Sequence, residues 1–528
     1  MPRRSQKRKG EGGPEMGIRG PAEAPAPVQS GEGGQSPAPV ASPTSAVSDG
    51  PAVWDVAVVG AGLGGLAVAA LLARRGRAVV LVEQASEAGG LCRPLRREES
   101  AFDPGLELLL GFADGGPGRR LLARLGLEVP LGVADPGVQI ALPRHRLSLP
   151  ADPDGWWPEI RREFPGEEGG WHSLLDELAS LAAEREAILR RLPPLPPTGW
   201  HARAHAWRVL TFGCERLRRM ATTPFAATLQ RHGLGADSRQ ALEALLAALD
   251  FRDAGQTSTL EAAAVFQWFR AGVACLPEGA PGLARALADS LEKSGGVLRL
   301  NTRADRCLVE RGRIVGIETG TAATLRARDV VAAVPAPVLL ALLPPARRWL
   351  GRRRPLEASA PTQVVEMMLG RVPEAYLPSE LVAHCLTVLD ADRPAGAGNL
   401  VRLQVAPGGE AAGETRQIAL SGLCRPEEAP SPARLLATLE QVCPGAPGVL
   451  ADSWHVSAAA LAEHWGRPCG TPRFGVTSRA WLGRRGLPQQ LPWRGLWAVG
   501  DATLSGGFLP DLLESALRLV DQLAGEES

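Results

Sequence analysis

The chain has no long apolar run. Among its 528 residues no stretch of 18 or more is apolar, so no segment has the composition of a membrane-spanning helix. The first 19 residues hold six basic and two acidic side chains, but the apolar run that a secretory signal peptide needs does not follow them. We therefore expect a cytoplasmic protein, and peripheral contact with the cytoplasmic face of a membrane stays open.

Paired cysteines, metal-binding clusters and a basic surplus are also missing. The eight cysteines are scattered without a CxxC pair, which fits a reducing compartment. His201 and His205 stand one helical turn apart, but no third ligand is near them in the sequence, so we expect no metal. From residue 51 onward 52 basic and 52 acidic side chains balance, which argues against nucleic acid as a partner.

Residues 1–50 differ in kind from the rest of the chain. They are rich in Pro, Gly, Ser and Ala and show almost no aliphatic periodicity, so they cannot bury enough apolar surface to fold. We predict a disordered tail, either inert or in contact with anionic lipid or nucleic acid through its basic residues. Met16 is an alternative start.

A nucleotide-binding unit occupies residues 54–93. The apolar run 56–59 predicts a strand covered on both faces, and a GxGxxG turn follows it. In such a turn Gly60 permits the tight bend, Gly62 lets the backbone approach a pyrophosphate, and Gly65 lets the next helix pack against the strand. The predicted cofactor-binding positions of the turn are Gly60, Gly62, Leu63, Gly64 and Gly65.

A helix and an acidic residue complete this unit. The helix expected from 66 to 75 points its free N–H groups at the diphosphate, and a second strand follows at 79–82. Glu83 closes that strand, where an acid can accept hydrogen bonds from ribose hydroxyls. An α/β turn without a nucleotide is the alternative, and Glu83 alone does not separate FAD from NAD.

The next residues, AGGLCR at 88–93 and FDPG at 102–105, resemble the FAD-dependent phytoene desaturases, carotenoid isomerases and retinol saturases, which are relatives of the amine oxidases. In that family a glycine pair runs beneath the flavin and a basic residue close behind it approaches the cofactor. The resemblance implies FAD as the cofactor and assigns Gly89, Gly90 and Arg93 to its binding. An ordinary surface turn is the alternative for the glycine pair.

Two later segments carry the same resemblance. A hairpin expected around 303–317 implies that Ala304 supplies backbone groups to the adenine, although many members have valine there. Near the C-terminus an apolar run leads into Gly500-Asp501, and a helix is expected from about 511 to 523. The resemblance implies that the acid binds the ribityl or pyrophosphate part of FAD and that the helix N-terminus faces the flavin. It adds to the predicted cofactor-binding positions Gly500, Asp501, Phe508 and Leu509.

Lysine and tyrosine are scarce, and the resemblance gives this scarcity a meaning. The monoamine oxidase relatives place a lysine near the flavin N5 and frame the substrate with aromatic residues, often tyrosines. After residue 50 the chain has only Lys293 and Tyr376. Amine oxidation is therefore the less favoured reaction. Asp511 has two interpretations that both stay open, a helix cap or a residue beside the substrate.

The fold predicted from these motifs is α/β. A Rossmann-like FAD-binding domain of the glutathione reductase and amine oxidase type is expected to be assembled from residues 51–110, 276–340 and 466–528. An inserted α+β substrate domain is expected from residues 111–275 and 341–465. Residues 200–220 mix tryptophans and arginines, which is typical of a helix on an anionic bilayer or of a core helix with a solvated basic face.

The sequence thus predicts an FAD-dependent oxidoreductase that acts on a hydrophobic polyene or another lipophilic small molecule. The expected reactions are desaturation, saturation or cis-trans isomerisation of a carotenoid-like substrate, with the flavin carrying the chemistry. No catalytic acid or base is assigned. The alternatives are an amine or protoporphyrinogen oxidase and a catalytically silent FAD-dependent carrier. Direct use of NAD(P)H would call for a second GxGxxG unit, which the sequence does not contain.

Overall fold

The computed structural model describes residues 51–98, 100–104, 108–192, 197, 199–211, 214–250, 252–320, 323–343, 363–406, 415–428, 431–467, 486–503 and 508–525. The predicted disordered tail, residues 1–50, lies outside this range.

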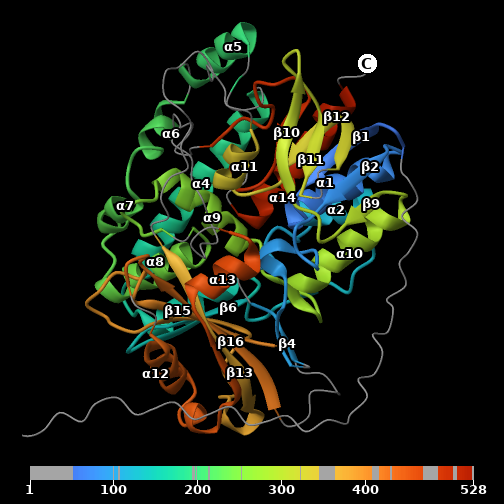
Figure 1. Cartoon of the computed structure of the whole chain (residues 1–528). Helices are drawn as coiled ribbons and strands as arrows, with labels where there is room; N and C mark the ends of the chain where they lie inside the picture. The colour runs from blue at the N-terminus through green and yellow to red at the C-terminus, as the bar shows by residue number, and fades with distance from the viewer. Residues whose placement is uncertain are drawn as a thin grey trace, which may run out of the picture. The chain divides into compact units, whose positions relative to one another are not determined.

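Three distant parts of the chain form one seven-stranded sheet (Figure 1). The central strand β1 pairs in parallel with β2 and β12, β9 extends β2, and β18 lies beside β12. Strands β10 to β12 form an antiparallel extension. The strands are β1 (Trp54–Val59), β2 (Val79–Val82), β9 (Val297–Arg299), β10 (Ala304–Glu310), β11 (Arg313–Thr319), β12 (Thr324–Ala332) and β18 (Leu496–Ala498).

Helix α1 (Leu63–Arg74) lies at the centre of the layer that covers this sheet. Every residue from 63 to 73 is buried, because α10 (Gly279–Lys293) and α14 (Leu509–Gly525) pack beside it. A helix enclosed by its neighbours needs apolar residues on all faces, which explains its run of Ala, Val and Leu.

Helix α2 (Pro117–Leu125) lies beyond the predicted domain boundary at residue 110 but packs with helices of the predicted FAD-binding domain. This helix was expected in the substrate domain, but its leucines join the same apolar cluster as α1 and α14. The helix begins at a proline, and it ends at Gly126, which has the left-handed conformation. The remainder of the predicted division into domains stays a prediction.

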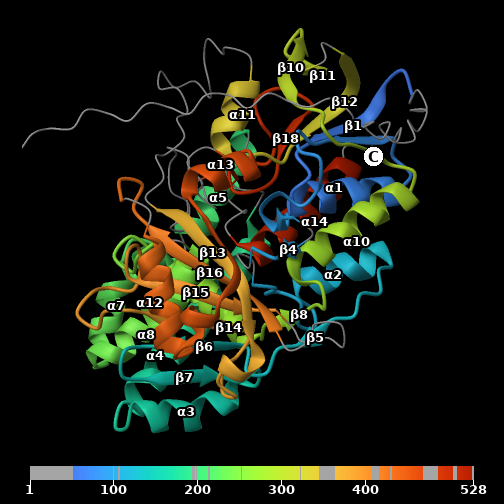
Figure 2. The same cartoon turned by 60° about the horizontal axis from the view of Figure 1, so that its bottom comes forward.

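The inserted segments form a second seven-stranded sheet in the order β17-β13-β16-β15-β14-β6-β7 (Figure 2). All neighbours are antiparallel except β14 and β6. Side chains alternate between its faces, so that Met367 of β13 faces the helical part whereas Met368 faces α12 (Pro432–Val442). The strands are β6 (Val138–Ala141), β7 (Arg146–Leu149), β13 (Val364–Pro373), β14 (His384–Val388), β15 (Leu400–Val405), β16 (Thr415–Cys424) and β17 (Ala451–Val456).

The remaining helices mostly belong to the inserted segments. They are α3 (Trp156–Glu163), α4 (Glu168–Arg191), α5 (Trp200–Thr211), α6 (Glu215–Met220), α7 (Phe225–Arg231), α8 (Ala236–Asp250), α9 (Thr259–Arg270), α11 (Ala336–Leu342) and α13 (Ala458–Trp465). The short strand pairs are β3 (Leu95–Arg97) with β4 (Ser100–Phe102), and β5 (Gly132–Val133) with β8 (Ala274–Cys275). No helix in the described part of the chain combines the length and hydropathy needed to cross a bilayer.

A buried carboxylate joins two strands of the second sheet to helix α12. Glu366 of β13 is 1% exposed, and it accepts hydrogen bonds from Arg434 of α12 (2.6 Å), His455 of β17 (3.1 Å) and the backbone of Ser431 (2.8 Å). Burial alone would raise the pKa of Glu366, but these three donors together hold it below its usual value. The ionised carboxylate therefore stabilises the fold.

We predict that Glu366→Gln lowers the free energy of unfolding by about 3 kcal/mol at neutral pH, because the buried Arg434 charge loses the nearer of its two carboxylate partners. The unfolded pKa of glutamate is about 4.3 and the folded pKa of Glu366 is lower. Its contribution is thus complete above about 4.3 and is lost as the pH falls through the folded pKa. Urea unfolding between neutral and acidic pH measures both effects, and the acid-dependent loss should be smaller in the variant.

Glu310→Gln is the matched control, because Glu310 forms an ion pair with Arg326 in which both side chains are more than half exposed. Its unfolding midpoint should equal that of the wild type. Equal stability of the Glu366 variant and the wild type would show that the buried carboxylate does not stabilise this sheet.

Candidate functional site

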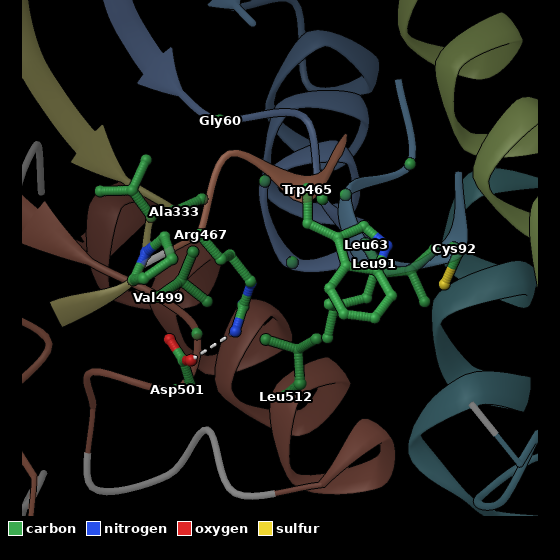
Figure 3. Close-up of a pocket in the computed structure, with 18 of the residues that line it drawn as sticks. Gly60, Leu63, Leu91, Cys92, Ala333, Trp465, Arg467, Val499, Asp501 and Leu512 are labelled. Carbon is green, nitrogen blue, oxygen red and sulfur yellow. Dashed lines mark hydrogen bonds and ion pairs between the residues drawn. The ribbon is translucent and has the colours of Figure 1, made fainter. Parts of the chain in front are cut away.

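One cavity lies at the carboxyl ends of the parallel strands β1 and β2 and beside β12 and β18 (Figure 3). All fourteen positions predicted from the sequence line it, although they come from five separate places in the chain. They are Gly60, Gly62, Leu63, Gly64, Gly65, Glu83, Gly89, Gly90, Arg93, Ala304, Gly500, Asp501, Phe508 and Leu509. Their role as FAD contacts stays a prediction, whereas their assembly around one cavity is a property of the fold.

The first glycine turn contains glycines of two kinds. Gly60 has a φ of +99°, and a Cβ there would lie 2.6 Å from the carbonyl oxygen of Ala333. A Cβ on Gly65 would collide with the carbonyl oxygen of Gly60. Gly62 differs, since a Cβ on it would meet no protein atom within 4 Å. Gly60 and Gly65 are therefore required by the protein's own packing, and Gly62 leaves room for a ligand.

The second glycine turn lies directly against the first. Gly89 and Gly90 have φ values of +128° and +60°, and a Cβ on Gly90 would lie 3.0 Å from the Cα of Gly62. The amide of Gly89 donates to the carbonyl of Ala61 at 2.8 Å. Gly89 is buried and both residues line the cavity, so the alternative of an ordinary surface turn is wrong.

Glu83 is fixed at the end of β2. Its Oε2 accepts from the amide of Ala61 at 2.8 Å, and its Oε1 accepts from the amide of Ala85 at 3.0 Å. Each carboxylate oxygen keeps a further lone pair for a ribose hydroxyl. Ala304, the first residue of β10, lines the same cavity together with Thr302. Both features fit the nucleoside half of a dinucleotide.

Positive charge also borders the cavity. Arg93 is only 9% exposed, and burial lowers its pKa, an effect partly offset by Glu83 and Glu87. Arg467 forms an ion pair with Asp501 at 3.1 Å, and both side chains are largely buried. Figure 3 shows the two side chains facing each other inside the pocket.

The sequence reasoning missed Trp465, Gly466 and Arg467, which bring the end of α13 to the cavity. Gly466 has a φ of +60° and ends the helix in the left-handed conformation. In the sequence, the Trp-Gly pair indicates only where a helix ends. That this helix end lies at the same cavity as the glycine turns follows from tertiary packing. Figure 3 shows Trp465, Leu63 and Leu91 among the side chains that line the pocket.

The remaining cavity wall includes a set of apolar side chains. This set is contributed by leucines that precede α2, by α8 and by α11, together with the residues before α14. These lining residues are Leu108, Leu110, Leu249, Val338, Leu342 and Phe508. None of the described lining residues is Lys or Tyr. Lys293 is exposed at the end of α10, and Tyr376 is 40% exposed in a short turn, Glu374–Tyr376.

Two further points concern Asp511 and a possible metal site. Asp511 lies in the first turn of α14 and is not among the residues that line the cavity, and both of its interpretations stay predictions. Across the described ranges no group of three or more His, Cys, Asp or Glu side chains could hold a metal ion.

The residues of the cavity fit a flavin dinucleotide. Gly62 provides close backbone approach, the N-termini of α1 and α14 offer free N–H groups for anionic atoms, and Glu83 offers acceptors for a ribose. Fold and site together define a flavoprotein with FAD as its cofactor.

The chain belongs to the flavin containing amine oxidoreductase family, whose model matches residues 63–368, more than half of the chain. This membership confirms the predicted cofactor and the α/β fold. A solved structure with the same fold is cyclohexylamine oxidase from Brevibacterium oxydans, with a TM-score of 0.59 over 90% of this chain and 99% of that structure. Its sequence identity is 17%, so the likeness concerns the fold alone.

Sequence relatives are retinol reductases. Human all-trans-retinol 13,14-reductase is 30% identical over 153 residues, which are 27% of this chain and 24% of the human protein. The inactive all-trans-retinol 13,14-reductase of Danio rerio is 49% identical over 51 residues, 10% of this chain and 8% of that protein. The similarity thus spans a quarter or less of these relatives.

We predict that Gly62→Ala and Gly65→Ala separate cofactor binding from folding. The methyl of Gly62→Ala enters ligand space, so FAD affinity should fall at least about tenfold while the cofactor-free protein keeps its unfolding temperature. Gly65→Ala should lower that temperature, because its methyl collides with the carbonyl of Gly60. Fluorescence titration with FAD and thermal unfolding without it measure the two effects. Unchanged FAD affinity in the Gly62 variant would place the cofactor elsewhere.

Proposed function

We propose that this chain is an FAD-dependent oxidoreductase acting on a hydrophobic polyene, by desaturation, saturation or cis-trans isomerisation. The observation that carries the proposal is the apolar wall of the cavity, formed by residues such as Leu108, Leu249 and Leu342. A hydrocarbon chain gains free energy by leaving water for such a surface. The local similarity to all-trans-retinol 13,14-reductases supports a substrate of this class.

The charged lining residues have roles on the cofactor side in this proposal. Glu83 accepts from a ribose, and the Arg467 guanidinium, which holds Asp501 at 3.1 Å, supplies positive charge for phosphate oxygens. When bound, FAD supplies hydride transfer at its ring system. The apolar wall excludes water and holds the polyene against that ring. This division of roles needs no acid or base beside the hydrocarbon, and we assign none.

Amine oxidation is the second candidate, because the family and the fold are shared with amine oxidases. The lysine and the tyrosines expected of that reaction are not found among the described lining residues. Lys293 and Tyr376, both exposed, do not line the cavity. We therefore favour the polyene.

The reaction class is tested by expressing the chain in strains that accumulate phytoene, lycopene isomers or neurosporene, and by incubating the FAD-loaded protein with all-trans-retinol. Chromatography should show a changed double-bond count or geometry in at least one polyene. Conversion of amines or porphyrinogens instead would assign the alternative oxidase. Bound FAD with no conversion of any compound would favour a silent carrier and contradict the proposal.

Leu249→Trp tests the apolar wall itself. The larger ring fills part of the cavity, so kcat/KM for the polyene should fall at least about tenfold, with FAD still bound. Val133→Trp adds similar bulk at a position that is 66% exposed and outside the cavity, and its turnover should match the wild type. Equal turnover in the Leu249 variant would remove α8 from the substrate site.

A further inference from the structure

The outer face of α5 exposes two tryptophans. Trp200 is 72% exposed and Trp207 is 64% exposed, and their spacing of seven residues puts them on one face, two turns apart. Only five large hydrophobic side chains of the described residues are exposed, and the others are scattered at Val53, Val133 and Tyr376. Two of these five exposed side chains thus lie on one face of a single helix.

The rest of α5 shows why the tryptophans point outward. Ala206 and Val209, on the opposite side, are its buried residues. His205 Nε2 lies 2.8 Å from the carbonyl oxygen of Arg191 at the end of α4, which ties the helix to its neighbour. The protein thus holds α5 by small apolar residues and a polar contact, and both of its large aromatic residues remain outside the core. A core helix with a solvated basic face accounts for the buried Ala206 and Val209 but not for the two exposed tryptophans.

Positive charge accompanies the tryptophans. Arg203 lies between them along the helix and Arg208 follows Trp207, and both arginines are exposed. Helix α5 contains no acidic residue. Residues 199–220 hold five arginines and one glutamate, in a chain whose net charge is only +1. The surplus of cations is a local property of this segment.

We propose that this surface, the α5 face (Trp200, Arg203, Ala204, Trp207 and Arg208), docks on an anionic lipid bilayer. Indole rings favour the boundary between acyl chains and water, and guanidinium groups bind anionic headgroups at the same depth. A helix of 12 residues with this pattern lies along the surface and does not enter the hydrocarbon. Docking would bring the protein to the bilayer, where a lipophilic substrate dissolves. Binding to the bilayer does not depend on catalytic turnover.

The charges favour a bilayer over a second copy of the chain. A two-fold dimer would place the α5 face against itself and oppose arginines to arginines. The nearest helix, α6, adds exposed Arg218 and Arg219 and one acidic residue, Glu215, so it offers little charge compensation. Arg216 is already paired with Glu184 at 3.4 Å.

Cosedimentation of the full-length, FAD-loaded chain with lipid vesicles tests this proposal. We expect binding to phosphatidylcholine vesicles that contain phosphatidylglycerol, much weaker binding to phosphatidylcholine alone, and release by salt. Arg203→Gln with Arg208→Gln should weaken binding roughly thirtyfold. Trp200→Ala with Trp207→Ala should weaken it at least about tenfold.

Control variants remove the same net charge, or an exposed aromatic ring, at positions outside the α5 face. Arg306→Gln with Arg326→Gln removes two exposed charges from the β10–β12 hairpin, and Tyr376→Ala removes an exposed aromatic ring. Both should bind vesicles like the wild type, and all variants should keep the flavin spectrum and unfolding temperature.

Vesicle binding that the α5 variants retain, or wild-type protein that stays in the supernatant, would overturn the proposal. Self-association abolished by the tryptophan variants, without vesicle binding, would assign the face to a second copy and overturn it as well. Polyene turnover measured in detergent is independent of docking. A failure of the α5 face and a failure of the proposed function are therefore distinguishable.

Discussion

The close contact of two glycine turns is the constraint on which the site depends. Gly90 lies so near Gly62 that a side chain on Gly90 would approach the Cα of Gly62 to 3.0 Å, and the amide of Gly89 is bonded to Ala61. This contact brings residues 88–93 to the N-terminus of α1. It makes one continuous wall from Glu83 past the glycines to Arg93, and strands β12 and β18 complete the wall from distant parts of the chain.

Motifs that are local in sequence were predicted well. The first glycine turn, Glu83 and Gly500-Asp501 each follow an apolar strand, and the carboxyl ends of parallel strands meet at one sheet edge. Their assembly around one cavity therefore followed from the motifs. Trp465, Arg467 and Leu249 were not predicted, because they reach the cavity from α13 and α8 through packing that no local pattern encodes. The packing of α2 against α1 and α14 was not predicted for the same reason, since its leucines match either layer.

The two sides of the cavity support different kinds of conclusion. The cofactor side is polar and built from family motifs, and the family match identifies the cofactor as FAD. The apolar lining comes both from segments predicted for the FAD domain, such as Leu108 and Phe508, and from the inserted segments, such as Leu249. The similarity to the retinol reductases covers only a short part of those proteins. The chemistry of the apolar lining, a leucine-rich wall with Trp465 and Phe508 as aromatic lining residues, is the basis for a lipophilic substrate. Docking through the α5 face would bring the protein to the lipid bilayer, in which such a substrate dissolves.

Single-turnover mixing under anaerobic conditions tests the central claim most directly. The FAD-loaded protein, in its oxidised and its reduced state, is mixed with one equivalent of all-trans-retinol or a carotenoid while the flavin spectrum and the polyene are followed together. We predict conversion of the polyene in one redox state, with a matching flavin change for desaturation or saturation, or with the flavin still reduced for isomerisation. An unchanged polyene in both states, with flavin fully bound, would contradict the account.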